Sequence, residues 1–328
     1  MRYQYFNDFC QYKFKYQMRL VIKELGAFIK SDFNLWLYGF FFIFLFVAIR
    51  FNYIHGFYWN FINIQVSVPE KVLRYFFLFA IPWFLIAVPK LLLSKKMEVL
   101  KNSKFYITIV LILLVISVDS ASILYQPFLK FAASFDEQLY LTKILTNLQG
   151  ILILLCTTIV ILLLFRKIRV TDLGLRLKGV NLKPYFILII AIVPMIVWAS
   201  FNPDFITTYP VYKPWQFPVL FKIPKIISAI IYEFLYGFDF ITIEFVFRGL
   251  LVILMARYLG NDAVLPMAAV YCFLHLGKPE VEAISSIFGG YFLGVVALNT
   301  RSIAPGVILH LSLAYMMDIA AYIQHFAK

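Results

Sequence analysis

Charged residues are scarce in this chain. Only 14% of its 328 residues are Asp, Glu, Lys or Arg, and 62% are hydrophobic. A soluble globular domain is usually about a quarter charged, so this composition excludes an ordinary soluble protein and predicts an integral membrane protein. Cysteine is rare as well, and Cys10, Cys156 and Cys272 lie far apart in the sequence. This spacing predicts neither a disulfide framework nor a CxxC metal pair.

Long apolar runs account for most of the remaining sequence. Because a helix needs about 20 mostly apolar residues to cross a bilayer, we predict an all-α polytopic membrane protein with roughly eight or nine transmembrane helices. The first and third runs are short, which leaves the number of spans open. In chain order, the predicted spans are residues 35–49, 75–93, 105–118, 148–165, 185–201, 240–258, 264–276, 282–298 and 303–323.

Acidic residues are outnumbered by basic ones, 17 to 30, which gives a formal net charge of +13. The basic residues gather in the N-terminal arm and in two loops, at residues 95–104 and 166–183. These segments lie on one side of the membrane if the spans alternate, and the positive-inside rule makes that side cytoplasmic. We therefore expect a cytoplasmic N-terminus that contacts membrane lipid, with no nucleic-acid partner. The Phe-, Ile-, Tyr- and Lys-rich usage is typical of an AT-rich bacterial genome, which favours the inner (cell) membrane of a bacterium.

The chain divides into three parts by composition. Residues 1–34 mix aromatic and basic side chains, which predicts an arm at the cytoplasmic interface. Residues 35–170 hold bland apolar spans that we interpret as supporting helices. Residues 171–328 bring polar side chains into the predicted spans, and such residues normally face a bundle interior or a water-filled cavity. The titratable candidates of this last part are Glu233, Asp239, Glu244, Arg248, His275, His310 and Asp318.

Two features of this part indicate chemistry. Glu244 and Arg248 are spaced so that a helix places them one above the other, within reach of an ion pair. His275 and His310 follow in apolar runs on later spans. Each feature alone is commonly structural, but together they favour hydrolysis, since a carboxylate accepts a proton from water and an imidazole stabilises an oxyanion. A zinc ion held by Glu244, His275 and His310 remains an alternative, although HExxH is absent.

The order of these residues resembles the CAAX-protease and bacteriocin-processing (CPBP, or Abi) family of intramembrane endopeptidases. Glu244 and Arg248 match the second Glu and the Arg of the family motif Glu-Glu-x-x-x-Arg. Tyr271 stands at the Phe of the motif Phe-x-x-x-His, and His275 matches its His. His310 matches the His of the third motif, His-x-x-x-Asn. The resemblance implies a C-terminal Abi-like helical bundle.

Two positions depart from the family pattern. Ile243 stands where the family has its first Glu, the residue held to activate the attacking water, and Ala314 stands at the Asn of the third motif. Asp239 lies four residues before Ile243, and Asp318 lies four residues after Ala314. Each acid is therefore one helical turn from a vacated position, on nearly the same face. We interpret the chain as a variant with a single Glu in its first motif.

The resemblance implies an endopeptidase that hydrolyses a peptide bond in a membrane-embedded or prenylated peptide. In this hypothesis Glu244 polarises the attacking water and is helped or replaced by Asp239. His275 and His310 stabilise the tetrahedral oxyanion or orient the water. Arg248 holds Glu244 ionised, because a buried carboxylate without a counter-charge takes up a proton and becomes a poor base.

Two further residues are expected to meet the substrate. Tyr271 lies one turn before His275, and Glu233 lies about three turns before Glu244 on the same helix face. Two other functions stay open. One is a catalytically inactive membrane scaffold or immunity protein of the same fold, which the replacements at positions 243 and 314 favour. The weaker one is a proton-coupled transporter that uses the same acids and histidines.

Overall fold

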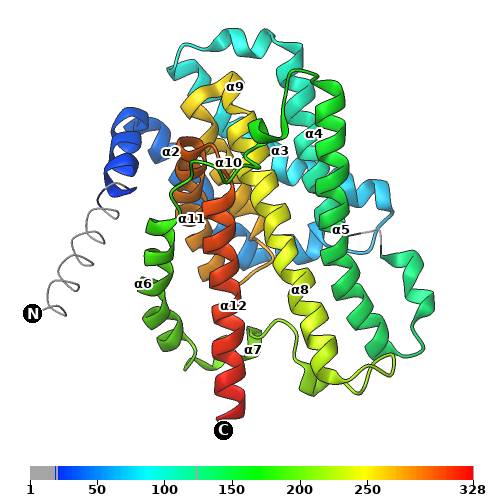
Figure 1. The fold of residues 1–328 in the computed structure, drawn as a ribbon. Helices are drawn as coiled ribbons and strands as arrows, with labels where there is room; N and C mark the ends of the chain where they lie inside the picture. The colour runs from blue at the N-terminus through cyan, green and yellow to red at the C-terminus, as the bar shows by residue number, and fades with distance from the viewer. Residues whose placement is uncertain (1–18, 20, 123–124, 328) are drawn as a thin grey trace, which may run out of the picture.

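Helices joined by loops make up the fold (Figure 1). The computed structural model describes residues 19, 21–122 and 125–327, and no strand element occurs among these residues. This confirms the predicted all-α class. Part of the expected N-terminal arm lies outside the described residues, but residues 21–32 form a helix.

Six of the described helices are long and apolar enough to cross a membrane. Their number is lower than the roughly eight or nine that the apolar runs predict. These helices are α2 (Leu35–His55), α3 (Val68–Leu93), α4 (Ser103–Ala121), α5 (Phe135–Leu164), α11 (Glu280–Thr300) and α12 (Ala304–Phe326).

Three predicted spans are helical but do not meet these requirements. Helix α6 (Lys183–Ala199) is short for a bilayer crossing. The span predicted at residues 240–258 covers the end of helix α8 (Lys225–Glu244) and the π-helical turns that follow it, so it is not one regular α-helix. Helix α10 (Val264–Leu274) has only 11 residues and is buried along nearly its whole length. Its apolar composition reflects contact with other helices rather than with lipid.

Short elements connect these helices. They are η1 (Tyr58–Ile62), η2 (Met97–Lys101), η3 (Gln126–Phe131), η4 (Val170–Leu173), α7 (Pro203–Thr208), η5 (Pro214–Gln216), η6 (Phe245–Leu254), α9 (Ala256–Leu259) and η7 (Gly260–Ala263).

Element η6 continues α8 without a break, but its turns are π-helical. Every residue from Phe245 to Leu254 is buried. π-Helical turns are rare and often mark functional positions, because they change the direction of the side chains that follow. Glu244 is the last residue before this change.

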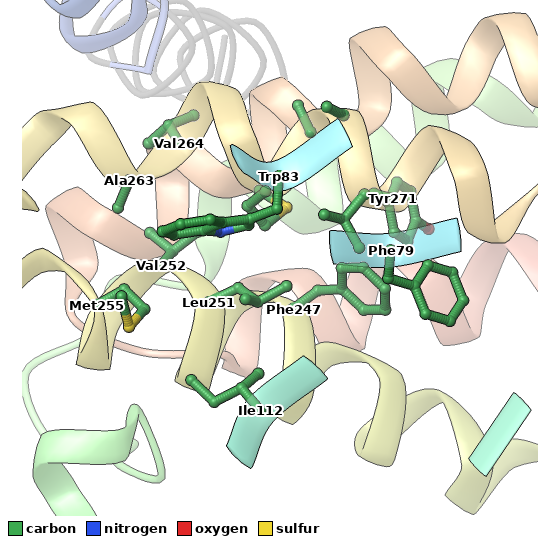
Figure 2. Packing of buried hydrophobic residues seen from close by; sticks show 14 of the residues in the cluster. Phe79, Trp83, Ile112, Phe247, Leu251, Val252, Met255, Ala263, Val264 and Tyr271 are labelled. Atoms are coloured by element: carbon green, nitrogen blue, oxygen red, sulfur yellow. The ribbon is translucent and has the colours of Figure 1, made fainter. Parts of the chain in front are cut away.

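The hydrophobic core lies where η6 and α10 meet α3, α4 and α11. Figure 2 shows Phe79 and Trp83 of α3 packed near Phe247 and Leu251 of η6, with Tyr271 of α10 close by. Helices α8 and α12 run side by side at the edge of this core (Figure 1). The core therefore holds η6 rigidly from several sides.

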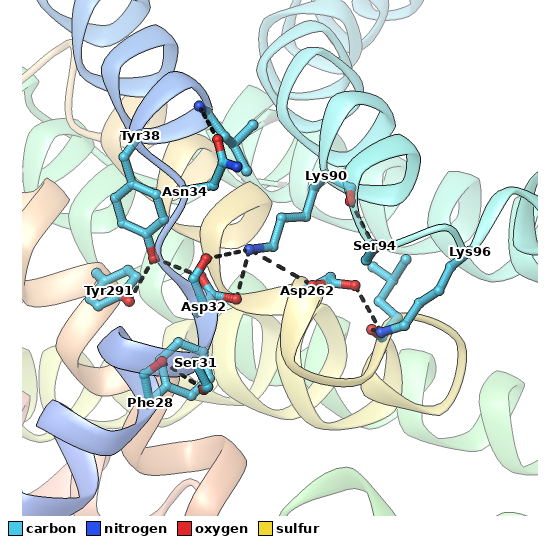
Figure 3. A network of polar contacts seen from close by, with 12 residues as sticks. Phe28, Ser31, Asp32, Asn34, Tyr38, Lys90, Ser94, Lys96, Asp262 and Tyr291 are labelled. Carbon is cyan, nitrogen blue, oxygen red and sulfur yellow. Dashed lines mark hydrogen bonds and ion pairs between the residues drawn. The ribbon is translucent and has the colours of Figure 1, made fainter.

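A buried ion-pair network joins the N-terminal part to the rest of the bundle (Figure 3). Lys90 of α3 donates to Oδ1 of Asp32 at 2.7 Å and lies 3.8 Å from Oδ1 of Asp262 in η7. Tyr38 of α2 donates to Oδ2 of Asp32 at 2.6 Å, and Lys96 donates to Oδ2 of Asp262 at 2.8 Å. Lys90 is thus the only described cation that joins both acids.

Replacing Lys90 by Met should destabilise the fold, because Asp32 would remain buried without a counter-charge. Breaking a buried ion pair from one side costs about 3–5 kcal/mol. We expect a clearly lower midpoint of thermal unfolding for Lys90→Met in detergent. Lys101→Met removes an exposed lysine and serves as the control. Equal midpoints for the two variants would contradict the role of the network.

Candidate active site

The ion pair expected from the sequence forms at the junction of α8 and η6. Nη1 of Arg248 lies 3.0 Å from Oε1 of Glu244, and neither side chain has any exposed surface. Two ionised groups without solvent stabilise each other strongly, and removal of either leaves an uncompensated buried charge. Glu244 is therefore held as a carboxylate in a fixed position.

His310 of α12 contacts the same carboxylate. Its Nδ1 lies 3.2 Å from Oε1 of Glu244, and its side chain is 21% exposed. A carboxylate only accepts hydrogen bonds, so Nδ1 carries the hydrogen and donates it. Nε2 of the neutral ring is then an acceptor with a free lone pair. Phe240 packs against the other side of the ring, with 4.5 Å between ring centroids.

The close approach of α12 to Glu244 depends on a glycine. Gly306 lies one turn before His310, and a Cβ at this position would overlap Oε2 of Glu244. Oε2 is buried and has no hydrogen-bond donor in the described part of the chain. Sequence analysis did not select Gly306, although a small residue one turn before a membrane histidine is a recognisable signal.

Tyr271 in α10 and His275 directly after it complete the cluster. The guanidinium of Arg248 lies over the ring of Tyr271, 4.3 Å from its centroid. The same ring lies edge-on to His275 at 4.6 Å and to His310 at 6.5 Å. Nδ1 of His275 lies 2.8 Å from the carbonyl oxygen of Tyr271. Because a carbonyl only accepts, neutral His275 also keeps Nε2 as an acceptor.

Asp239 lies away from this cluster. A Cβ on Gly150 of α5 would overlap Oδ1 of Asp239, so this side chain points toward α5. Asp239 and Glu244 point about 140° apart, since each residue of a helix advances by about 100°. The structure gives Asp239 no hydrogen bond or ion pair with Glu244 or with either histidine. Asp239 therefore does not lie beside Glu244, where the sequence predicted it.

Asp318 and Glu233 also lie elsewhere, facing each other from α12 and α8. Asp318 is about 12 Å along the helix axis from His310, at 1.5 Å per residue. Its Oδ1 accepts a hydrogen bond from the backbone N–H of Val211 at 3.2 Å. The polar residues of the last third thus form separate groups rather than one centre.

The donor set does not fit the zinc alternative. Among the described residues, no group of three or more His, Cys, Asp and Glu side chains is arranged to hold a metal ion. Oε1 of Glu244 already meets both Arg248 and Nδ1 of His310, and Nδ1 of His275 is used by a carbonyl.

Six apolar helices surround this buried polar centre, as expected of an integral membrane protein. Residues 225–316 match the family model described as "Type II CAAX prenyl endopeptidase Rce1-like". The match includes Glu244, Arg248, Tyr271, His275 and His310, and it confirms the resemblance to CAAX-type proteases for this segment. Comparison with curated proteins and with solved structures gives no match.

Gly306→Ala should destabilise the protein, because the added methyl group must displace a carboxylate that Arg248 and His310 hold in place. Overpacking of this kind costs about 1–3 kcal/mol. The measurement is the midpoint of thermal unfolding in detergent. Gly289→Ala is the matched control, since a Cβ there meets no atom within 4 Å and alanine favours a helix. A midpoint for Gly306→Ala as high as that of the control would contradict the close approach of α12.

Proposed function

We propose that this protein is an intramembrane endopeptidase that hydrolyses a peptide bond in a membrane-embedded or prenylated peptide. The observation that carries the proposal is the contact between Oε1 of Glu244 and Nδ1 of His310, beside the buried Arg248. The match of residues 225–316 to CAAX-type endopeptidases supports the reaction class. The basic loops support a cytoplasmic N-terminus in a bacterial inner membrane.

His310, rather than Glu244, is the proposed general base. Glu244 has no exposed surface, whereas His310 is partly exposed and its Nε2 is free. Nε2 of His310 takes a proton from water while the water oxygen bonds to the substrate carbonyl carbon. When the C–N bond breaks, the imidazolium returns this proton to the leaving amine. Glu244 acts as a positioning residue that stabilises the imidazolium, and Arg248 keeps Glu244 ionised.

His275 is proposed to orient the attacking water. With its Nδ1 hydrogen donated to the carbonyl of Tyr271, the neutral ring offers only an acceptor at Nε2. Such an acceptor binds the second hydrogen of a water whose first hydrogen points to His310. Tyr271 lies near both rings and supplies an aromatic wall next to this water.

A specific observation favours the second candidate, a catalytically inactive scaffold of the same fold. Ile243 packs against the hydrophobic core and Ala314 is buried, so the two family positions that usually carry polar groups are apolar here. In that case Glu244, Arg248 and His310 only fasten α12 to α8.

Cleavage of a fluorogenic prenylated peptide by the purified protein separates the two candidates. We expect His310→Ala and Glu244→Gln to lower kcat by about 10²–10⁴-fold, the usual contribution of general base catalysis. His325→Ala is the matched control, because His325 stacks on Trp215 near the C-terminus. Asp239→Asn should likewise retain activity.

One result would contradict the proposed base, and another would contradict the protease. If the wild-type protein cleaves and His310→Ala cleaves equally fast, the proposed base is wrong. If neither cleaves any prenylated or membrane-embedded peptide, while Glu244→Gln folds normally and still binds the same membrane partners, the scaffold is the better description.

A further inference from the structure

A second pair of acids is buried between α8 and α12. The carboxyl groups of Glu233 and Asp318 face each other, and the hydroxyl of Tyr315, about one turn before Asp318 on α12, donates to the backbone carbonyl of Glu233 at 2.8 Å. Asp318 is only 3% exposed. With both groups ionised, neither oxygen of Glu233 has a donor in the described part of the chain, and Oδ2 of Asp318 has none either. Buried acceptors without donors are costly, so the pair requires a hydrogen-bond donor that the doubly ionised form lacks.

No cation neutralises this pair. Among the described residues, no Lys, Arg or His forms an ion pair with Glu233 or Asp318. The loop cation Lys213 directs its Nζ to the backbone carbonyls of Pro210 at 2.9 Å and Thr207 at 3.1 Å. Two facing carboxylates in a low-dielectric environment repel each other strongly. One proton between them removes the repulsion and creates a short O–H···O hydrogen bond.

The same pair holds the loop that follows α7. Oδ1 of Asp318 accepts from the N–H of Val211 at 3.2 Å. The hydroxyl of Tyr322 donates to the carbonyl of Tyr212 at 3.4 Å, from one turn further along α12. Residues 209–213 are thus fastened to α12 beside the acid pair.

We propose that Glu233 and Asp318 bind one shared proton, and that this proton keeps residues 209–213 docked on α8 and α12. At low pH the proton is present, the acids attract each other and the loop is held. As the pH rises the proton leaves, two negative charges face each other, and α12 loses its hold on the loop. The inference concerns proton binding and does not depend on peptide hydrolysis.

The other groups that face the pair do not explain a change near neutral pH. Most are tyrosines, and burial together with the nearby Glu282 raises the pKa of Tyr209, which keeps its hydroxyl neutral. Burial lowers the pKa of Lys213, but its ammonium group stays bound to backbone carbonyls. The facing groups are Tyr232 and Tyr236 on α8, Tyr315 and Tyr322 on α12, Glu282 on α11, and Tyr209, Lys213 and Lys278 in loops.

Hydrogen exchange of residues 209–213 in the full-length protein tests the proposal. After correction for intrinsic exchange, protection of this segment should fall about tenfold or more between about pH 6 and pH 9. Glu233→Gln should abolish this fall, because its amide donates to Asp318 at every pH. Asp318→Asn should do the same, since its Oδ1 still accepts from Val211 and its amide donates to Glu233. The second variant serves if the first does not fold.

Asp119→Asn is the matched control. It removes another acid of a membrane-spanning helix, partly buried in α4 and away from this loop, and should keep the wild-type pH dependence. Protection that does not change with pH in the wild-type protein would overturn the proposal. So would an undiminished fall in both Glu233→Gln and Asp318→Asn.

Discussion

The buried ion pair between Glu244 and Arg248 is the interaction on which the rest of this site depends. Charges without solvent are tolerated only when they are paired, and here both side chains are fully enclosed. The pair therefore requires a rigid environment, which the packing of η6 against α3, α4 and α10 provides. The core of this protein thus surrounds a charge pair and keeps it away from lipid.

The ion pair also determines which residues are accessible. Glu244 contacts His310 only through Oε1, and of these two side chains only the imidazole is exposed. A carboxylate held in this way behaves like the acid of a catalytic triad, which orients a histidine without meeting the substrate. In the proposed mechanism, this division of roles supplies a base in a chain that has Ile243 in place of the family's first Glu. The apolar residue at position 243 belongs to the packing that holds the pair.

Much of the site was predictable from the sequence, because spacing within one helix fixes relative direction. The interval between Glu244 and Arg248 predicted their ion pair, and the apolar runs around His275 and His310 placed both rings inside the bundle. Composition likewise predicted the all-α membrane class. Periodicity does not reveal which neighbouring helix covers a given face. For that reason Asp239 was expected near the site but faces α5.

The same limitation affected the helices and the second acid pair. The run that forms α10 is as apolar as a membrane span, and only tertiary packing shows that it is short and enclosed. Glu233 was expected to meet substrate, but its partner is Asp318, a contact between elements that are far apart in the sequence. The π-helical turns of η6 have no sequence signal of their own, and only the structure reveals them.

The central claim is that buried Glu244 fixes the hydrogen of His310 on Nδ1 and leaves Nε2 as the base. Nitrogen-15 NMR of the His310 ring, assigned by loss of its signals in His310→Ala, measures this tautomer directly in the purified protein. We predict a neutral ring with a protonated Nδ1 and an unprotonated Nε2 in the wild-type protein, and a mixture of tautomers in Glu244→Gln. A ring protonated on Nε2, or one that Glu244→Gln leaves unchanged, would contradict the account.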